Sequence, residues 1–496
     1  MNEAYEKLKQ RLGEVSDIQG AMAVLMWDQL VMMPPGGAGV RAERVGTLTR
    51  LAHERFVSDE VGELLDELAP LEAELPFESD EASLIRVTRR DWEKRRRVPA
   101  DLAAEMARHA SQADKAWVQA RAASDFAAFK PWLQKTFELK RRYVDCFEPA
   151  GDPYDVLLDD YEPGLTTGVV EPVFERLKEG LAPLIDAADA AEEDFERGPF
   201  PEERQHELSL FVLDRFGFTR EDWRLDPTVH PFCQSFATSD IRLTTRYAAD
   251  DLSSLFSAMH EFGHGVYERG VSPHLERTPL AAGASMAMHE SQSRLWENLV
   301  GRSLPFWRWA YPEAQKAFPG ILGDVELERF HRAINRVRPS YIRVDADETT
   351  YGMHIILRFE LERQLLAGSI DLDDLPAAWN AKMAEYLGVD VTEDRVGVLQ
   401  DIHWSGGMVG YFPSYQLGNV ISVQIWDKVR EGIPDLDEQL ERGDFAELRS
   451  WLGEHVYRHG RKFTTGQLLE RLVGGGIDPE PYLAYLDDKL STLSPA

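Results

Sequence analysis

The sequence predicts a mainly α-helical fold with a small β-element beside one central helix. Apolar residues recur at steps of three or four over most of the chain, which is the spacing of one face of an α-helix. Over residues 3–27 this face consists of Leu8, Leu12, Val15, Ile18, Met22 and Leu25. Only residues 240–247 clearly alternate with a period of two. The chain has no internal repeat, low-complexity linker or clear boundary, so we expect residues 1–496 to form a single domain.

The helical period extends along the whole chain. It predicts further helices over residues 41–56, 100–125, 130–145, 170–195, 205–216, 326–336, 351–367, 376–386, 418–431 and 444–457. In the alternating segment, Ile241, Leu243 and Thr245 fall on one face, and the β-forming residues there predict a strand. This strand directly precedes a helical stretch that ends near Gly270.

The charge balance excludes several classes of partner. The 55 Lys and Arg residues against 86 Asp and Glu residues give a formal net charge of −31. A surface this acidic repels phosphate backbones and anionic headgroups, so we expect neither nucleic acid nor membrane as a partner. The two cysteines have no paired spacing, and the N-terminus lacks a signal-peptide pattern. The sequence therefore predicts a reduced, cytoplasmic protein.

The segment His260-Glu261-Phe262-Gly263-His264 matches the motif HExxH. Histidines four residues apart lie on one helical face, so both imidazoles can reach one zinc ion. Glu261 can then take the proton of a metal-activated water as that water attacks a carbonyl group. The motif therefore predicts a zinc-dependent peptidase.

A hydrolytic zinc site needs a third protein ligand. Residues 283–300 predict a following helix, on which Glu290 lies 26 residues beyond the end of the motif, enough for an antiparallel return. His289 and Glu297 compete with Glu290 as the third ligand on spacing alone. Arg294 and Glu297 share a helical side with Glu290 and are candidates to orient the ligands.

With the following segments, the HExxH motif resembles the carboxypeptidase Taq family of metallocarboxypeptidases. The family's motifs appear in order as HPF at 230–232, DIRLT at 240–244, HESQ at 289–292, IRVDAD at 342–347 and GVLQDIHW at 397–404. The segments WDQ at 27–29 and MMPPGG at 32–37 are also family-like. The resemblance therefore spans nearly the whole chain.

The resemblance implies a homodimeric, mostly helical enzyme of the gluzincin-like HExxH type with a deep central groove. The helices of residues 1–100 would form one wall or lid of that groove. The implied metal ligands are His260, His264 and Glu290, with Glu261 catalytic. The usual metal is zinc, and cobalt often supports activity. The implied reaction releases single amino acids from the C-termini of short or unfolded peptides, with broad specificity and with proline disfavoured.

An exopeptidase must recognise the free carboxylate of its substrate, which calls for an arginine or for converging donors. Arg343 is the first candidate, because it lies in the IRVDAD motif among acidic residues. The alternative is that Arg343 only forms a structural ion pair with Asp345 or Asp347. His230 stands before a proline in an extended or turn conformation and is expected to donate to the substrate backbone, or else to pack within its loop.

The strand of residues 240–247 is a second candidate for substrate binding. Its backbone could pair with an extended peptide, as edge strands do, and Arg242 or Arg246 could meet the substrate. The plainer interpretation is an edge strand that only supports the motif helix.

The oxyanion that develops during attack needs donors beyond the metal. His403 and the run GGMVGYFPSY at 406–415 are suited to this role, because the glycines let the loop approach a substrate closely. Tyr411 is our first choice for the phenol donor, and Tyr415 is the alternative.

Two other functions stay open at this point. An endo-oligopeptidase would share the metal centre. The HExxH motif determines the chemistry of hydrolysis, but not whether the enzyme cuts at the end of a peptide or inside it. A helical binding scaffold would carry structural zinc or none. Glu261 argues against the scaffold, because a structural site has no need of a base at an open metal position.

Overall fold

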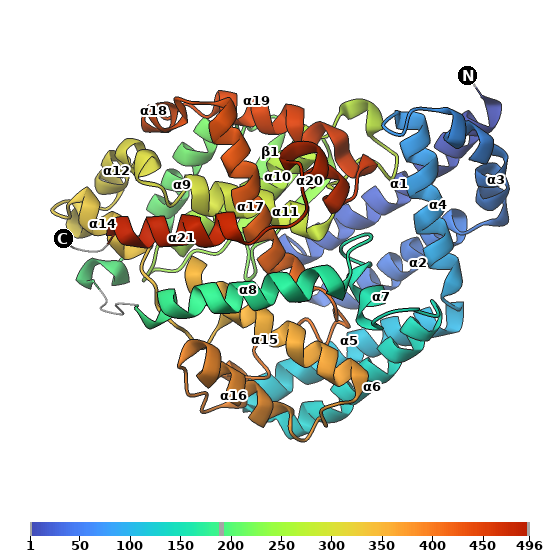
Figure 1. The fold of residues 1–496 in the computed structure, drawn as a ribbon, viewed down its shortest axis with the longest axis horizontal. Helices are drawn as coiled ribbons and strands as arrows, with labels where there is room; N and C mark the ends of the chain where they lie inside the picture. Colours follow the sequence, from blue (N-terminus) through green and yellow to red (C-terminus); the bar gives the residue numbers. More distant parts are fainter. Residues whose placement is uncertain (1, 188–192, 494–496) are drawn as a thin grey trace.

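The fold is mainly α-helical around one small sheet, as the sequence predicts (Figure 1). The computed structural model describes residues 2–187 and 193–493. The helices that match predicted stretches are α1 (Glu3–Val31), α2 (Ala38–Phe56), α5 (Ala100–Ala123), α6 (Phe126–Asp145), α9 (Glu202–Phe216), α14 (Leu327–Ile334), α15 (Glu348–Ala367), α16 (Leu375–Leu387), α17 (Phe412–Gly432) and α19 (Ala446–His455).

Helix α8 (Thr167–Asp186) ends before the predicted limit of residue 195. Residues 188–192 of that prediction lie outside the described residues, and Asp194–Arg197 form a 3-10 turn. The other helices are α3 (Asp59–Glu74), α4 (Asp80–Arg97), α7 (Tyr154–Leu158), α10 (Ser253–Gly270), α11 (Met286–Arg294), α12 (Leu304–Ala317), α13 (Pro319–Leu322), α18 (Leu436–Glu441), α20 (Thr465–Val473) and α21 (Glu480–Leu493). Among the described residues, no helix combines the length and the apolar character needed to cross a membrane.

The sheet corrects one prediction. Its strands are β1 (Trp223–Pro227), β2 (Cys233–Ala237) and β3 (Asp240–Thr245), in the order β1-β3-β2. The predicted strand of residues 240–247 is β3, but it lies in the centre, parallel to β1 and antiparallel to β2. Because neighbours occupy both of its backbone edges, β3 cannot pair with a substrate, and its interpretation as an edge strand is wrong. The outer strand β2 lines the cavity described below.

The N-terminal helices have an apolar core of their own. It includes Leu8, Leu65 and Leu84 of α1, α3 and α4, together with Leu275 and Leu280 from the segment after α10. The main core is built from described residues between Trp117 and Leu486. Ion pairs also join the two parts, such as Arg277 with Asp17 at 2.6 Å and Arg461 with Asp91 at 2.9 Å.

Two glycines allow the helices of the site to approach one another closely. A Cβ at Gly263 of α10 would lie 2.4 Å from the backbone oxygen of Gln292 in α11. A Cβ at Gly418 of α17 would lie 2.5 Å from the Cβ of Glu290. Helix α11 is therefore held between α10 and α17, with Glu290 at the contact. The predicted helix 283–300 begins only at Met286, and it continues after Arg294 as a π-helical turn over Leu295–Val300.

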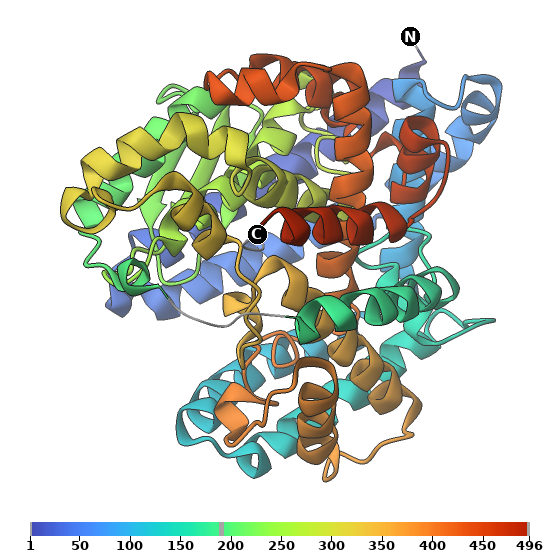
Figure 2. The same cartoon turned by 60° about the vertical axis from the view of Figure 1, so that its left-hand side comes forward.

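Figure 2 shows the same fold turned by 60°. Helices α5, α6, α15 and α16 gather in the lower part in both views, and α10 lies in the upper part. Helix α15 packs on α6, α8, α16 and α17, and so connects the lower helices to the helices around the motif.

Candidate active site

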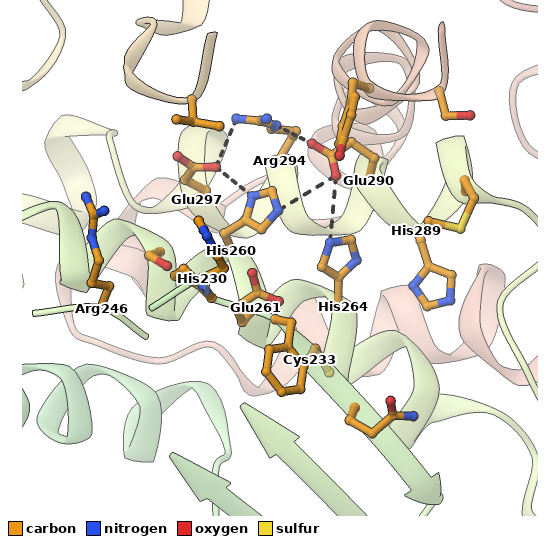
Figure 3. Close-up of a pocket in the computed structure, with 18 of the residues that line it drawn as sticks. His230, Cys233, Arg246, His260, Glu261, His264, His289, Glu290, Arg294 and Glu297 are labelled. Atoms are coloured by element: carbon orange, nitrogen blue, oxygen red, sulfur yellow. Dashed lines mark hydrogen bonds and ion pairs between the residues drawn. The ribbon is translucent and has the colours of Figure 1, made fainter. Parts of the chain in front are cut away.

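Three side chains from α10 and α11 converge in a geometry that can hold one metal ion (Figure 3). His260, His264 and Glu290 place one ligand atom each within 4.8 Å of one another. The Nε2 atoms of both histidines lie 3.7 Å from Oε2 of Glu290. Two imidazoles and one carboxylate are a donor set that zinc accepts while keeping a fourth position open. Among the described residues, no other group of this kind was found.

The alternative third ligands have other partners. Glu297 accepts a hydrogen bond from Nδ1 of His260 at 2.8 Å, which directs Nε2 toward Glu290. Nε2 of His289 lies 2.7 Å from a carboxylate oxygen of Glu268, and His289 stands outside the three-residue group. The geometry therefore favours Glu290 over both competitors and places Glu297 where it can orient the His260 ring.

Arg294 joins the two carboxylates that flank His260. Its Nε donates to Glu290 at 2.7 Å, and its Nη1 donates to Glu297 at 3.2 Å (Figure 3). Burial alone would raise the pKa of Glu297, but Arg294 and His260 lower that pKa to about 2. Glu297 is therefore ionised and is a strong acceptor for the imidazole N–H.

Glu261 lies beside this group and lines the same cavity. Burial raises the pKa of its carboxyl to about 7. A base with a pKa near neutrality both accepts and returns a proton readily. Cys233 of β2 lies next to it in Figure 3, and burial raises the pKa of that thiol well above its ordinary value.

The candidate metal centre opens into a cavity of about 1870 Å³. Its walls include β2 on one side and Ser16, Asp17 and Gly20 of α1 on another. This cavity corresponds to the deep groove that the sequence resemblance implies, and α1 forms part of its wall.

Arg343 lines the cavity, but not with the partners considered from the sequence. Its Nε and Nη2 donate to Asp401 at 3.0 and 2.9 Å, and its Nη1 donates to the Tyr351 hydroxyl at 3.0 Å. Its backbone N–H donates to Gln400. The predicted partner Asp347 instead caps α15. The motifs IRVDAD and GVLQDIHW therefore lie side by side and hold the Arg343 guanidinium rigidly at the cavity.

The three candidates for oxyanion stabilisation also come together. Nε2 of His403 lies 3.2 Å from the Tyr415 hydroxyl, and the rings of Tyr411 and Tyr415 are 5.1 Å apart. Burial raises the pKa of Tyr411 to about 12, so its phenol remains a proton donor at neutral pH. Burial and the nearby Arg343 lower the pKa of His403 to about 3, so its ring stays neutral.

The depressed pKa of His403 predicts a specific loss of stability in acid. An unfolded chain would bind this proton near the ordinary pKa of 6.5, whereas the folded chain binds it only near 3. Stability therefore falls as the pH drops through this window, by roughly 2 kcal/mol between about pH 7 and pH 5. Replacing His403 with glutamine should reduce the acid-induced shift of the urea unfolding midpoint. An equal shift in the variant and the wild type would contradict the assignment of this loss of stability to His403.

The remaining predicted substrate residues separate into two groups. His230 and Arg246 line the cavity, and Figure 3 shows His230 beside His260 and Arg246 farther from it. Arg242 does not line it. Its guanidinium donates to Asp240 at 2.9 and 2.8 Å and lies 4.7 Å from the Trp27 ring centre. We therefore withdraw the assignment of Arg242 to substrate binding.

Several residues that shape the site have no functional role that the sequence predicts. Asp401 and Gln400 belong to a motif that was recognised, yet their attachment to Arg343 depends on contacts across 58 and 57 positions. No motif or residue spacing pointed to a role of Tyr351 at the site; the sequence only placed it in a predicted helix. The pairing of Glu268 with His289 likewise appears only in the fold.

This fold and this site define a class of protein. Two histidines and a carboxylate arranged around one metal position, with a buried glutamate beside them in a large cavity, are the components of a metallopeptidase active site.

Comparisons with known proteins identify the family. Residues 7–490 match the family described as Carboxypeptidase Taq (M32) metallopeptidase. Thermostable carboxypeptidase 1 of Thermus thermophilus is 38% identical over 506 residues, with 99% of each chain covered. Carboxypeptidase 1 of Bacillus subtilis is 37% identical over 487 residues, with 97% of each chain covered. The crystal structure of the M32 carboxypeptidase from Deinococcus radiodurans R1 superposes with a TM-score of 0.96 at 40% identity, with 99% of each chain covered. The chain belongs to the carboxypeptidase Taq (M32) family and is a metallocarboxypeptidase, which confirms the prediction from its motifs.

Proposed function

We propose that this metallocarboxypeptidase uses zinc, held by His260, His264 and Glu290, to release single amino acids from the C-termini of short or unfolded peptides. We expect broad specificity, with proline disfavoured, and we expect cobalt to substitute for zinc. The observation that carries the proposal is the position of Arg343. Its guanidinium lines the same cavity as the three ligands and is held by Asp401. A fixed guanidinium is suited to bind a terminal carboxylate through two hydrogen bonds.

Each residue has a distinct part in the proposed reaction. A bound zinc ion lowers the pKa of a water and polarises the scissile carbonyl. Glu261 accepts the proton of the attacking water and returns it to the leaving amine. Tyr411 donates to the developing oxyanion, and Tyr415, hydrogen-bonded to His403, is the alternative donor.

The substrate backbone would lie along β2. This strand lines the cavity, and within the sheet it pairs with β3 alone. An extended peptide can therefore add to its outer edge. We assign His230 to the same backbone, because it also lines this part of the cavity. The role first considered for residues 240–247 thus moves to β2.

A pair of peptides tests the proposal against an endo-oligopeptidase. One unstructured peptide and its C-terminally amidated twin are incubated with the protein and followed by mass spectrometry. We expect a ladder of single-residue losses from the free peptide, with the amidated twin cleaved only at a trace rate. Internal cuts in both peptides would instead establish an endo-oligopeptidase and remove Arg343 from its role.

We further propose a cytoplasmic homodimer, in which α1–α4 form one wall or lid of the groove within a single catalytic domain. Both cysteines are unpaired, which suits a reducing compartment.

The apolar side chains of Met26, Leu30 and Val40 are 48%, 60% and 61% exposed around the turn between α1 and α2 and are candidates for a subunit contact. Light scattering during size-exclusion chromatography measures the mass of the protein in solution. A monomeric mass would contradict the dimer.

Removing the carboxylate that orients His260 should weaken metal binding without removing a ligand. In Glu297→Gln, the acceptor of the His260 Nδ1–H becomes neutral, and Arg294 loses one of its two anionic partners. We expect zinc affinity to fall by about 10- to 100-fold, measured by competition with a chromophoric chelator. Glu268→Gln, which changes a cavity glutamate that pairs with His289, is the matched control. Equal affinities for Glu297→Gln and the wild type would contradict the orienting role.

A further inference from the structure

A buried carboxylate outside the metal site connects the segments that carry His403 and Tyr411. Glu362 of α15 is fully buried. Its Oε1 accepts a hydrogen bond from the Trp404 indole at 2.7 Å, and its Oε2 accepts one from the Gly410 backbone N–H at 2.9 Å. Trp404 directly follows His403, and Gly410 directly precedes Tyr411. One side chain therefore fixes both ends of the loop formed by residues 404–410.

The three groups around Glu362 need a carboxylate. The Tyr154 hydroxyl also donates to Oε2, at 2.5 Å. An indole N–H and a backbone N–H can only donate. Burial raises the pKa of Glu362 to about 7, and in its ionised form the carboxylate accepts from both, one on each oxygen. A glutamine at this position would turn its amide nitrogen toward either Trp404 or Gly410. One N–H of the loop would then face another donor, which is costly in a buried site.

The backbone at Gly410 presses the loop against α7. Gly410 has φ +93°, and a Cβ there would lie 2.7 Å from the Leu157 carbonyl oxygen. Lys140 adds a positive charge near Glu362, and its side chain also approaches Gly407. The loop is thus held at its ends by Glu362 and flanked along its length by α6 and α7.

We propose that Glu362 is a positioning residue, which holds His403 and Tyr411 in place at the cavity through Trp404 and Gly410. The consequence for catalysis rests on the proposed function, because it requires these two residues to stabilise the oxyanion. The consequence for the loop does not depend on any activity.

The first test is a mutant cycle with measured zinc content. We expect Glu362→Gln to lower kcat by about 10- to 100-fold, because small displacements of catalytic groups have effects of this size. Its KM should change by less than about twofold. In a background that already carries both His403→Gln and Tyr411→Phe, the same substitution should cost less than about threefold, because both groups that it positions have already been removed. Glu360→Gln is the control on the same helix; Glu360 contacts Lys178 and Tyr386, away from the loop.

The second test is hydrogen exchange over residues 403–411. Exchange there should quicken in Glu362→Gln and stay unchanged in Glu360→Gln, whether or not the protein cleaves any peptide. Equal losses of kcat in both backgrounds, or unchanged exchange of the loop, would overturn the proposal. If Glu362→Gln does not fold, Trp404→Phe removes one donor and keeps the carboxylate. The same cycle and the same exchange measurement then apply to that variant.

Discussion

Glu261→Gln is expected to lower kcat for peptide hydrolysis by on the order of 10³- to 10⁴-fold while zinc remains bound at one ion per chain. Glutamine preserves the size of the side chain but cannot accept the proton of the attacking water. The three ligand residues are unchanged, so the metal site stays intact. Activity on a free peptide and zinc content by elemental analysis are measured on the same sample.

The matched control for this variant is Ser257→Ala. Ser257 lies on α10 and lines the cavity near the motif, but it has no proposed part in the reaction. We expect its kcat to stay within about threefold of the wild type. Full activity in Glu261→Gln with zinc bound would contradict the assignment of the general base.

Arg343→Lys is expected to lower kcat/KM on peptides with a free C-terminus by about 100-fold, or roughly 3 kcal/mol. Lysine keeps a positive charge beside Asp401 but loses the planar fork that can bind a carboxylate with two hydrogen bonds. Slow cleavage of the amidated peptide should be unaffected, because that substrate offers no terminal carboxylate. Steady-state kinetics on both peptides measure the difference.

Arg358→Lys distinguishes recognition of the substrate carboxylate from structural support of Asp401. Arg358 is the second guanidinium on Asp401, with Nε–Oδ2 at 2.7 Å, but it is fully buried and does not line the cavity. We expect Arg358→Lys to change the ratio of kcat/KM between free and amidated peptides by less than about threefold. Equal effects of both lysine substitutions on that ratio would show that Arg343 only supports Asp401.

The helices and the convergence of the two motif histidines were predictable because their signals are local. The three-to-four spacing of apolar residues reports a helical face directly, and α1, α5 and α6 follow it. His260 and His264 are four residues apart on one helix, so their convergence needs no knowledge of the fold. Choosing Glu290 over Glu297 required more, because only the packing of α11 between Gly263 and Gly418 brings Glu290 to the two histidines.

What the sequence did not predict depends on contacts distant along the chain. The strands β1 and β2 are each five residues long, and β2 has no side-chain alternation in its burial. The central position of β3 follows from its pairing with both of them, and this removed the edge-strand interpretation. The attachment of Arg343 to Asp401 and of Glu362 to Trp404 spans 58 and 42 positions. No spacing rule relates residues that far apart.

The measurement that tests the central claim most directly is reconstitution of the metal-free protein. The protein is stripped with a chelator, its zinc content is measured, and zinc is added back in fractions of one equivalent while hydrolysis of a free peptide is followed. We predict no activity without metal and a linear return that ends at one zinc per chain. Glu290→Gln should fail to recover under the same titration. Full activity in the metal-free protein, or undiminished recovery in Glu290→Gln, would contradict a zinc-dependent site built from His260, His264 and Glu290.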